Sequence, residues 1–282
     1  MSKRQACQLF GIHESVFYYT PKPKDDREVE RELAELAQIH NRWGFWMMYH
    51  RLRALGHSWN HKKVYRIYTQ MGLNLHRKYK KRLPARVKEP LVQPLYPNMT
   101  WSMDFMQDSL ENGQKFRSFN IIDDFNREAL NITIDRSINS KRVIRELEQL
   151  IDWRGKPKRL RVDNGPEFIS QTLKDWCDEN AIEIKFIQKG KPNQNAYVER
   201  FNRTYRTEVL DNYLFNNIME AKLLTSCWMW MYNNERPHSS IGYQPPTTFA
   251  LKYGYRYGTI PTFQHDGNND WKTLILDTTK TG

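Results

Sequence analysis

Three acidic residues stand where carboxylates could do chemistry. Asp104 interrupts the strand-like stretch WSMDFM, and an acid is disfavoured in the middle of a strand. Asp163 ends the stretch KRLRV, at the carboxyl edge where open α/β sheets place ligands. Glu199 lies early in a predicted helix that follows a loop rich in Gly, Pro and Asn. Three carboxylates without nearby cysteines suit hard divalent cations such as Mg²⁺ or Mn²⁺. Two such ions would clamp the attacking and leaving oxygens of an in-line phosphoryl transfer, so the pattern predicts phosphodiester chemistry.

Each acid also has a structural interpretation. Asp163 begins Asp-Asn-Gly, which is a good turn in any protein, and Glu199 could be a solvated or capping acid of its helix. Asp104 is the hardest of the three to explain structurally. Its rivals for a catalytic role are the neighbouring acids Asp108, Asp123 and Asp124. We expect the last two of these to close a hairpin instead.

The charge of the chain is unevenly distributed. The 282 residues carry a net charge of +12. Residues 1–88 hold 19 Lys and Arg against 7 Asp and Glu, whereas residues 89–282 hold 25 of each sign. A basic third beside a neutral remainder favours an anionic polymer as partner, most simply nucleic acid, over a merely soluble basic surface.

Composition indicates a cytoplasmic protein. There is no run of about 18 apolar residues, so we expect no membrane span. The N-terminal stretch lacks the apolar segment of a signal peptide. The three cysteines, Cys7, Cys177 and Cys227, are far apart and odd in number, which predicts reduced thiols.

A dense basic run follows the first group of predicted helices. It is HRKYKKR, residues 76–82, and we expect it to contact DNA phosphates, although a solvated tail would have the same composition. Its predicted contact residues are Arg77, Lys78, Lys80, Lys81 and Arg82.

The first third predicts short helices. Residues 4–19 read as two helices around Gly11 with apolar residues at helical spacing, which resembles a helix-turn-helix or a hairpin that packs on the next segment. Further helices are predicted at 25–40, 43–55 and 61–71. The four prolines of 83–97 exclude a helix and predict an extended connection.

Beyond this connection the pattern alternates between strands and helices. Strands are predicted at 100–106, 115–125, 128–135, 158–162 and 182–187. Helices are predicted at 140–152, 167–180, 194–211 and 217–233. This order predicts an α/β fold with a mixed sheet and helices on its faces.

The predicted organisation has five parts. They are a short helix-turn-helix-like segment (1–24), a helical DNA-binding region (25–83), a Pro-rich linker (84–98), a catalytic core (99–255) and a C-terminal tail (256–282).

These motifs resemble a known family. WSMDF, VDNGPEF and GKPNQNAYVERFNRTYR, with 35 residues between Asp163 and Glu199, resemble the D-D-35-E signature of retroviral-type integrases and bacterial insertion-sequence transposases. The similarity is greatest to the catalytic subunit (OrfB) of two-reading-frame insertion-sequence transposases. WGFWMMYHRL (43–52) and YNNERPHSSIGYQPPTTF (232–249) are similar to that family's upstream and C-terminal motifs.

The resemblance implies an RNase H-like core in which Asp104, Asp163 and Glu199 form the metal-binding catalytic triad. It implies Mg²⁺ or Mn²⁺, with two ions, as cofactor. It also implies cleavage of DNA at element ends followed by strand transfer from the 3′-hydroxyl. Retroviral integrases carry a His₂Cys₂ zinc module. Here His57 and His61 have half of the spacing, but the next cysteine is Cys177, so we predict no zinc site.

The same resemblance implies partners. They are DNA, further copies of the chain on DNA, and an upstream-frame helix-turn-helix and coiled-coil subunit joined by frameshifting, in a nucleoid-associated bacterial protein. Near the acids we expect Lys191, Arg203 and Arg206 to contact DNA. Asn202, Arg203 and Arg206 share a helix face with Glu199, although Arg203 could simply pair with Glu199. Two alternative functions are a plain RNase H-like nuclease and a non-catalytic repressor that binds element ends.

Overall fold

The computed structural model describes residues 2–20, 25–75, 91–188 and 192–253. The basic run 76–82, Lys191 and the predicted tail 256–282 lie outside these ranges, and so does the first part of the predicted linker, residues 84–90. Within the described part of the chain, no helix is long and apolar enough to cross a membrane. Cys7, Cys177 and Cys227 are free thiols, as predicted.

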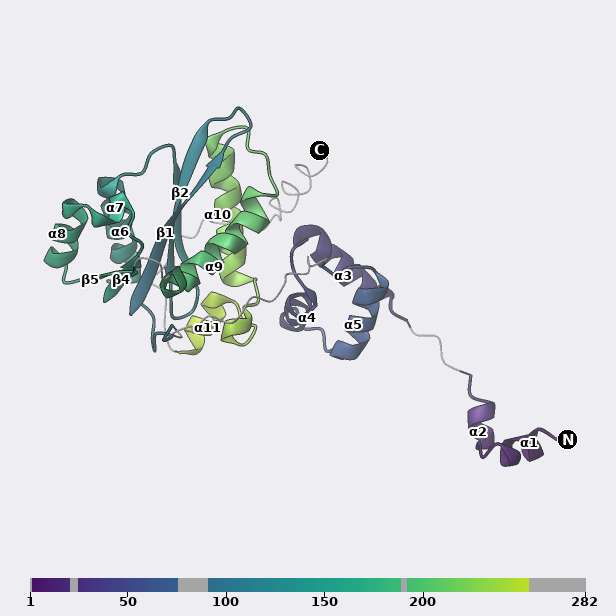
Figure 1. Cartoon of the computed structure of the whole chain (residues 1–282). Helices are drawn as coiled ribbons and strands as arrows, with labels where there is room; N and C mark the ends of the chain where they lie inside the picture. The colour runs from purple at the N-terminus through teal and green to yellow at the C-terminus, as the bar shows by residue number, and fades with distance from the viewer. Residues whose placement is uncertain (1, 21–24, 76–90, 189–191, 254–282) are drawn as a thin grey trace.

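A five-stranded mixed sheet forms the centre of the larger domain (Figure 1). Its strands are β1 (Thr100–Ser109), β2 (Lys115–Asp123), β3 (Ala129–Asp135), β4 (Arg159–Val162) and β5 (Glu183–Phe186). The order across the sheet is β3-β2-β1-β4-β5. The first three strands pair antiparallel, and β4 and β5 run parallel to β1. This confirms the predicted mixed sheet.

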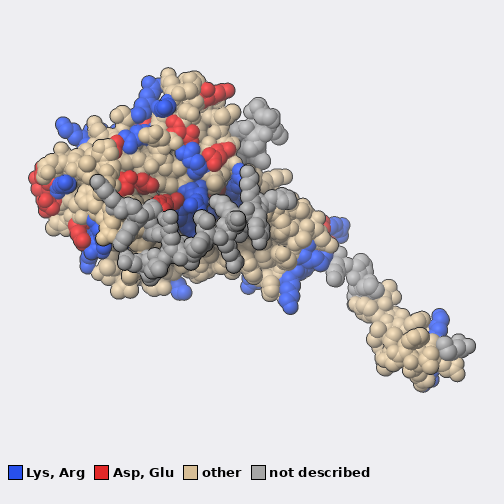
Figure 2. All heavy atoms as spheres, viewed as in Figure 1, with Lys and Arg blue, Asp and Glu red and all other residues tan. Residues whose placement is uncertain are grey.

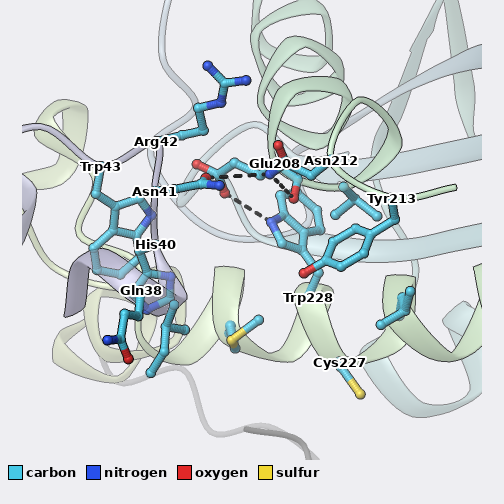
Figure 3. A pocket seen from close by; sticks show the side chains of 14 residues that line it. Gln38, His40, Asn41, Arg42, Trp43, Glu208, Asn212, Tyr213, Cys227 and Trp228 are labelled. Carbon is cyan, nitrogen blue, oxygen red and sulfur yellow. Dashed lines mark hydrogen bonds between the residues drawn. The ribbon is translucent and has the colours of Figure 1, made fainter. Parts of the chain in front are cut away.

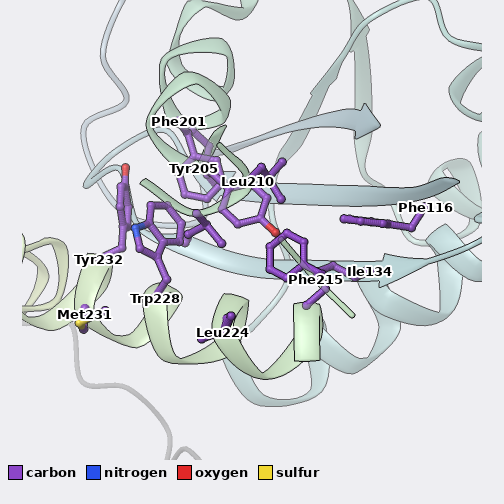
Figure 4. Packing of buried hydrophobic residues seen from close by; sticks show 14 of the residues in the cluster. Phe116, Ile134, Phe201, Tyr205, Leu210, Phe215, Leu224, Trp228, Met231 and Tyr232 are labelled. Carbon is purple, nitrogen blue, oxygen red and sulfur yellow. The ribbon is translucent and has the colours of Figure 1, made fainter. Parts of the chain in front are cut away.

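Helices cover both faces of this sheet (Figure 1). One face packs against α6 (Ser140–Arg154), α7 (Pro166–Ile169) and α8 (Gln171–Glu179). The other packs against α9 (Ala196–Tyr205), its π-helical continuation η2 (Arg206–Leu210) and α10 (Ile218–Asn234). A last helix, α11 (Pro246–Lys252), packs on α10. Between the sheet and α9–α10 the core is strongly aromatic (Figure 4).

The alternation of side chains along β1 decides where its acid points. Trp101 and Met103 enter the core under α6 and α8. Successive strand residues face opposite sides, so Ser102 and Asp104 face the side of α9. On β4, Leu160 and Val162 join the same core as Trp101, which turns Arg161 to the α9 side.

Two predicted helices differ in detail from the structure. The helix expected at 167–180 is broken at Ser170, whose backbone is extended and whose hydroxyl accepts a hydrogen bond from Leu173 N–H at 3.4 Å. Ser170 therefore starts a new helix as its N-cap. The helix expected at 194–211 is α-helical only to Tyr205 and continues as a π-turn.

The helical region is a small domain with its own core. Its helices are α3 (Arg27–Ile39), α4 (Phe45–Ala54) and α5 (His61–Gln70), as predicted. Val29, Leu33, Val64 and Ile67 are completely or almost completely buried in it. His57, one of the two histidines with half of the zinc-module spacing, stacks on Trp59 with ring centroids 4.1 Å apart.

The first helices form as predicted but do not bury their apolar residues. They are α1 (Lys3–Leu9) and α2 (Glu14–Phe17), which lie apart from the other helices (Figure 1). Leu9 is 73% exposed and Val16 64% exposed. Packing on the next segment, one of the two interpretations of this stretch, is therefore wrong, because nothing in the described chain covers these side chains.

Candidate active site

The strand register brings the first two predicted acids together. β1 and β4 are parallel neighbours, with Trp101 beside Leu160 and Ser102 beside Arg161. Two residues further along, Asp104 is level with Asp163, which directly follows β4. Asp104 lies two residues after Ser102, and Asp163 lies two residues after Arg161. Since Ser102 and Arg161 face α9, both carboxylates project to that side of the sheet.

Asp104 is a half-buried acid held by an amide network. Its Oδ1 accepts a hydrogen bond from Phe105 N–H at 2.9 Å, and its Oδ2 accepts one from Asn202 Nδ2 at 2.7 Å. Asn202 in turn accepts a hydrogen bond from Asn120 Nδ2 at 2.7 Å. Asn120 is the cross-strand neighbour of Asp104 on β2, so three elements fix this carboxylate.

The pKa of Asp104 is raised to about 6, chiefly by burial. The negative charges of Asp163 and Glu199 contribute to this rise, whereas the hydrogen bonds from Phe105 and Asn202 oppose it. Asp104 therefore senses the charges of the other two predicted acids. Proximity of like charges favours proton uptake or cation binding.

Glu199 approaches this place from α9, which packs on β1 and β2. Burial raises its pKa, and the charge of Arg203 one turn later lowers it. No ion pair within 4 Å joins Glu199 and Arg203, both of which are described. A simple surface pair between these two side chains is therefore absent from the structure.

The glycine that follows Asp163 makes room for its carboxylate. Asp163 Oδ1 accepts a hydrogen bond from Gly165 N–H at 2.9 Å. A Cβ atom placed on Gly165 would lie 2.9 Å from the same oxygen. The backbone of Gly165 has an ordinary φ of −65°, so space rather than conformation requires glycine here. Pro166 then starts α7 at once.

The rival acids have structural partners. Asp108 forms an ion pair with Arg206 at 2.8 Å. Asp123 accepts hydrogen bonds from the N–H groups of Asn98 and Phe125 beside the hairpin turn. Asp124 follows it in the turn and pairs with Arg161. The expected role of Asp123 and Asp124 in closing the hairpin agrees with these contacts.

The predicted DNA contacts are only partly visible. Arg203 is exposed on α9. The guanidinium of Arg206 is already engaged, since it also donates to the Gln107 carbonyl at 2.6 Å, but its side chain keeps 35% exposure. The described helical domain, residues 25–75, holds 8 Lys and Arg against 6 Asp and Glu, so the basic excess lies mostly elsewhere in the first third. Both signs are interspersed on the visible face of the larger domain (Figure 2).

Comparison with known families now becomes decisive. Two models described as "Integrase core domain" match residues 95–192 and 180–246, and a model described as "HTH-like domain" matches residues 23–82. An insertion element IS407 protein of 31.7 kDa from Burkholderia multivorans is 39% identical over 254 residues, covering 90% of this chain and 92% of that protein. The chain belongs to the insertion-sequence transposase family.

Other members of the transposase family are also similar in sequence to this chain. An IS476 protein of 39.2 kDa from Xanthomonas euvesicatoria is 38% identical, over 90% of this chain and 73% of that protein. The putative transposase for IS150 of Escherichia coli is 26% identical, over 80% and 85%. These relatives support a transposase of the OrfB type.

Among solved structures, the simian T-cell lymphotropic virus intasome in complex with the PP2A regulatory subunit B56γ has a TM-score of 0.50 and 20% identity. It covers 76% of this chain and 73% of that one. At this identity the likeness concerns the fold alone. It agrees with the predicted RNase H-like core behind a helix-turn-helix-like region.

In this transposase-family chain the oxygen atoms of the three acids are suitable ligands for a hard cation, but the side chains do not converge on one point. Asp104 and Asp163 offer oxygen ligands on neighbouring strands, as Mg²⁺ requires. No three His, Cys, Asp or Glu side chains of the described residues lie close enough together to hold an ion as they stand. Binding of a cation by all three acids would therefore require their side chains to come closer together.

The sequence did not indicate the roles of Asn202, Asn120 and Gly165. The helical spacing placed Asn202 on the face of Glu199, but gave no reason for an amide there. Its partner Asp104 is 98 positions away in the sequence, so only the folded chain connects them. The role of the glycine could have been suspected, because glycine has no Cβ and this one lies two residues after a candidate ligand.

Proposed function

We propose that this chain is a DNA transposase that cleaves one strand at an element end and joins the resulting 3′-hydroxyl to target DNA. Asp104, Asp163 and Glu199 are its catalytic acids. The observation that carries the proposal is the strand register that sets Asp104 level with Asp163, beneath the helix α9 that carries Glu199. A transposase-family core supplies the context, and metal-assisted phosphoryl transfer is the chemistry such acids support.

The proposed cofactor is Mg²⁺ or Mn²⁺, with two ions. Asp104 and Asp163 would hold one jointly, and Glu199 would complete the set. When bound, the metal supplies Lewis acidity at the scissile phosphate and at the attacking hydroxyl. The residues of the chain hold the carboxylates: the amide of Asn202 orients Asp104, and Gly165 leaves space for Asp163.

DNA is proposed to bind across the site through the helical domain and through basic side chains. The candidates near the acids are Lys191, Arg203 and Arg206. Arg206 would have to exchange Asp108 for a phosphate, because both compete for the same guanidinium. The run at Arg77, Lys78, Lys80, Lys81 and Arg82 is the proposed source of sequence-independent affinity.

The proposed assembly contains further copies of the chain on DNA and an upstream-frame subunit made by frameshifting. The family membership supports both proposals. In the cell the complex would be associated with the bacterial nucleoid.

The test is end cleavage by the purified full chain. Labelled element-end duplex is incubated with Mg²⁺, and products are examined for single-strand nicks with 3′-hydroxyl ends. Asp163→Asn should reduce nicking by about 10³-fold or more, roughly 4 kcal/mol of barrier. Asp175→Asn is the matched control, since Asp175 is exposed on α8 and bonds only Gln171 in the described chain.

Full nicking by Asp163→Asn would overturn the assignment. Binding to element ends by the wild-type chain, without nicks in Mg²⁺ or Mn²⁺, would instead favour the non-catalytic repressor. Nicking without preference for element ends would favour a plain nuclease.

A further inference from the structure

The two motifs that the catalytic site leaves unexplained meet in the folded chain. One is residues 43–52, which include most of α4 in the helical domain. The other is residues 232–249, which run from the end of α10 into α11. About 180 positions of sequence separate them, yet their side chains form a common interface. We call this interface the docking seam, and it comprises Trp43, His50 and Arg51 with Glu235, Arg236 and Tyr243.

An ion pair and a ring stack connect the two sides of the docking seam. Arg51 Nη2 lies 2.6 Å from Glu235 Oε1, with the two side chains only 18% and 16% exposed. The rings of His50 and Tyr243 stack with centroids 4.1 Å apart and planes 10° apart. An ion pair on the surface stabilises little unless its geometry is good, and this pair is partly buried and well aligned.

The backbone around Tyr243 is strained in a way that serves this stack. Tyr243 has a φ of +58°, a left-handed conformation that a bulky residue rarely adopts. Gly242 before it has a φ of +71°. The turn is closed by Tyr243 N–H donating to the His238 carbonyl at 2.8 Å, with a bridge between His238 and Gln244. Such strain persists only where surrounding structure holds it, and it concentrates at functional positions.

The rest of the C-terminal motif anchors the seam in the catalytic core. Asn233 bonds both the N–H and the carbonyl of Ala129 on β3, at 2.9 and 2.8 Å. Arg236 pairs with Glu208, which also accepts a hydrogen bond from Trp228 Nε1 at 3.0 Å. The motif therefore binds the sheet with some residues and the helical domain with others.

A small cavity of about 100 Å³ lies in the seam between the two domains (Figure 3). The helical domain contributes His40, Arg42 and Trp43 to its lining, and the core contributes Glu208 and Trp228. Asn212 Nδ2 reaches across to Asn41 Oδ1 at 3.5 Å. Burial, together with the charges of Arg236 and Arg51, lowers the pKa of His40 to about 3.

The core side of this cavity belongs to the helix that carries a catalytic acid. Glu199 is in the first turn of α9, and α9 continues without interruption into η2, which ends at Leu210. Glu208 is part of η2, and Asn212 lies two residues after its end. The helical domain therefore touches the far end of the element on which Glu199 is placed.

We propose that residues 235–243 are a docking surface for the helical domain of the same chain. Docking there fixes this domain against the far end of the Glu199 helix. It sets one distance between the DNA held by the helical domain and the carboxylates. The occupant is identified by complementarity: an arginine for Glu235, and a flat ring for Tyr243.

The test is a charge-swap cycle on the full chain without DNA or metal, read by hydrogen exchange and solution scattering. Arg51→Glu and Glu235→Arg should each speed exchange of residues 40–51 and 235–244 by about tenfold or more, because like charges then face each other. Each should also increase the radius of gyration. The double reversal should restore both. Arg53→Glu, the same change two residues along α4, should alter neither, since Arg53 bonds only the His57 carbonyl in the described chain.

Exchange in α5 shows whether the helical domain itself stays folded. Should Arg51→Glu unfold it, Glu235→Arg still tests the seam from the core side. Tyr243→Phe keeps the ring and should stay docked, whereas Tyr243→Gly keeps the turn and should not. Unchanged exchange and scattering in both single reversals would overturn the proposal. So would docking that depends on protein concentration, because the occupant would then be a second copy.

The docking readout is independent of the proposed catalysis, so either can fail alone. If both hold, the undocked single variants should bind element ends but nick them about tenfold more slowly and at less uniform positions. This consequence rests on the proposed function.

Discussion

Two clusters of three acids occupy different places on the same sheet. At the hairpin end of β2, Asp123, Asp124 and Glu128 are buried and matched by arginines. Arg154 makes two hydrogen bonds to Glu128, at 3.0 and 2.5 Å, and lies 3.8 Å from Asp123. Arg161 pairs with Asp124.

The other cluster, Asp104, Asp163 and Glu199, has no such match. Among the described residues, no Lys or Arg forms an ion pair with any of the three. Asp104 and Asp163 are half-buried and Glu199 is exposed, so the fold has left this group of acids short of positive charge. The two groups of acids differ in their partners rather than in their residue types. A divalent cation would supply the missing charge.

The largest expected difference is in stability. Asp124→Asn should lower the free energy of unfolding by about 3–5 kcal/mol, because it leaves Arg161 buried without a counter-charge. Asp163→Asn should cost less than about 1 kcal/mol or stabilise, because the Gly165 N–H keeps its acceptor and like-charge repulsion falls. Urea unfolding with chelator present measures both. Equal losses would abolish the distinction between the clusters.

Gly165→Ala tests the room left for Asp163. The new methyl group would press on Asp163 Oδ1 and displace the carboxylate. Nicking should fall by about 10- to 100-fold, since small misplacements of reacting groups are costly. Stability should change little, because the φ of −65° suits alanine. Nicking by Gly165→Ala at the wild-type rate would contradict this expectation, because it would show that the Asp163 carboxylate has other space to occupy.

Asn202→Ala tests the amide that holds Asp104. Losing this hydrogen bond should lower kcat about tenfold, which corresponds to about 1.4 kcal/mol of activation free energy. DNA affinity should stay unchanged. Thr204→Ala is the control on the same helix, because its hydroxyl bonds only the Arg200 carbonyl in the described chain. An effect on KM alone would mean that Asn202 contacts DNA rather than positioning the acid.

The smallest expected effect is the pH dependence of stability without metal. Burial raises the pKa of Asp104 to about 6 from an ordinary value of 3.8. Between these values the folded chain keeps a proton that the unfolded chain has released, so stability falls as pH rises from about 4 to about 6. Asp104→Asn should lack this loss, so its stability should gain on that of the wild type as pH rises from about 4 to about 6. A difference independent of pH would contradict the raised pKa.

Much of the fold could be predicted from sequence because its elements carry local patterns. Every predicted strand formed, and Asp104 and Asp163 lie where strand propensity and the edge rule placed them. The break at Ser170 was missed because a capping serine resembles any other polar residue in a helical pattern. The exposure of Leu9 and Val16 was missed because helical spacing predicts an apolar face but not what covers it.

The site was harder to predict because its discriminating contacts are long-range. Asp123 and Asp104 look alike in sequence. What separates them is Arg154 at one and Asn202 at the other, both distant along the chain. Similarly, the C-terminal motif could be matched to a family, but its contact with His50 and Arg51 becomes visible only in the folded chain.

The most direct test of the unmatched acids as a metal site is the shift in melting temperature caused by Mg²⁺. A ligand that binds only the folded state stabilises it by RT ln(1 + [L]/Kd). Wild type and the Arg203→Ala variant should gain stability as Mg²⁺ rises, whereas Asp104→Asn and Asp163→Asn should not respond. An equal Mg²⁺ response in Asp163→Asn and wild type would contradict the account.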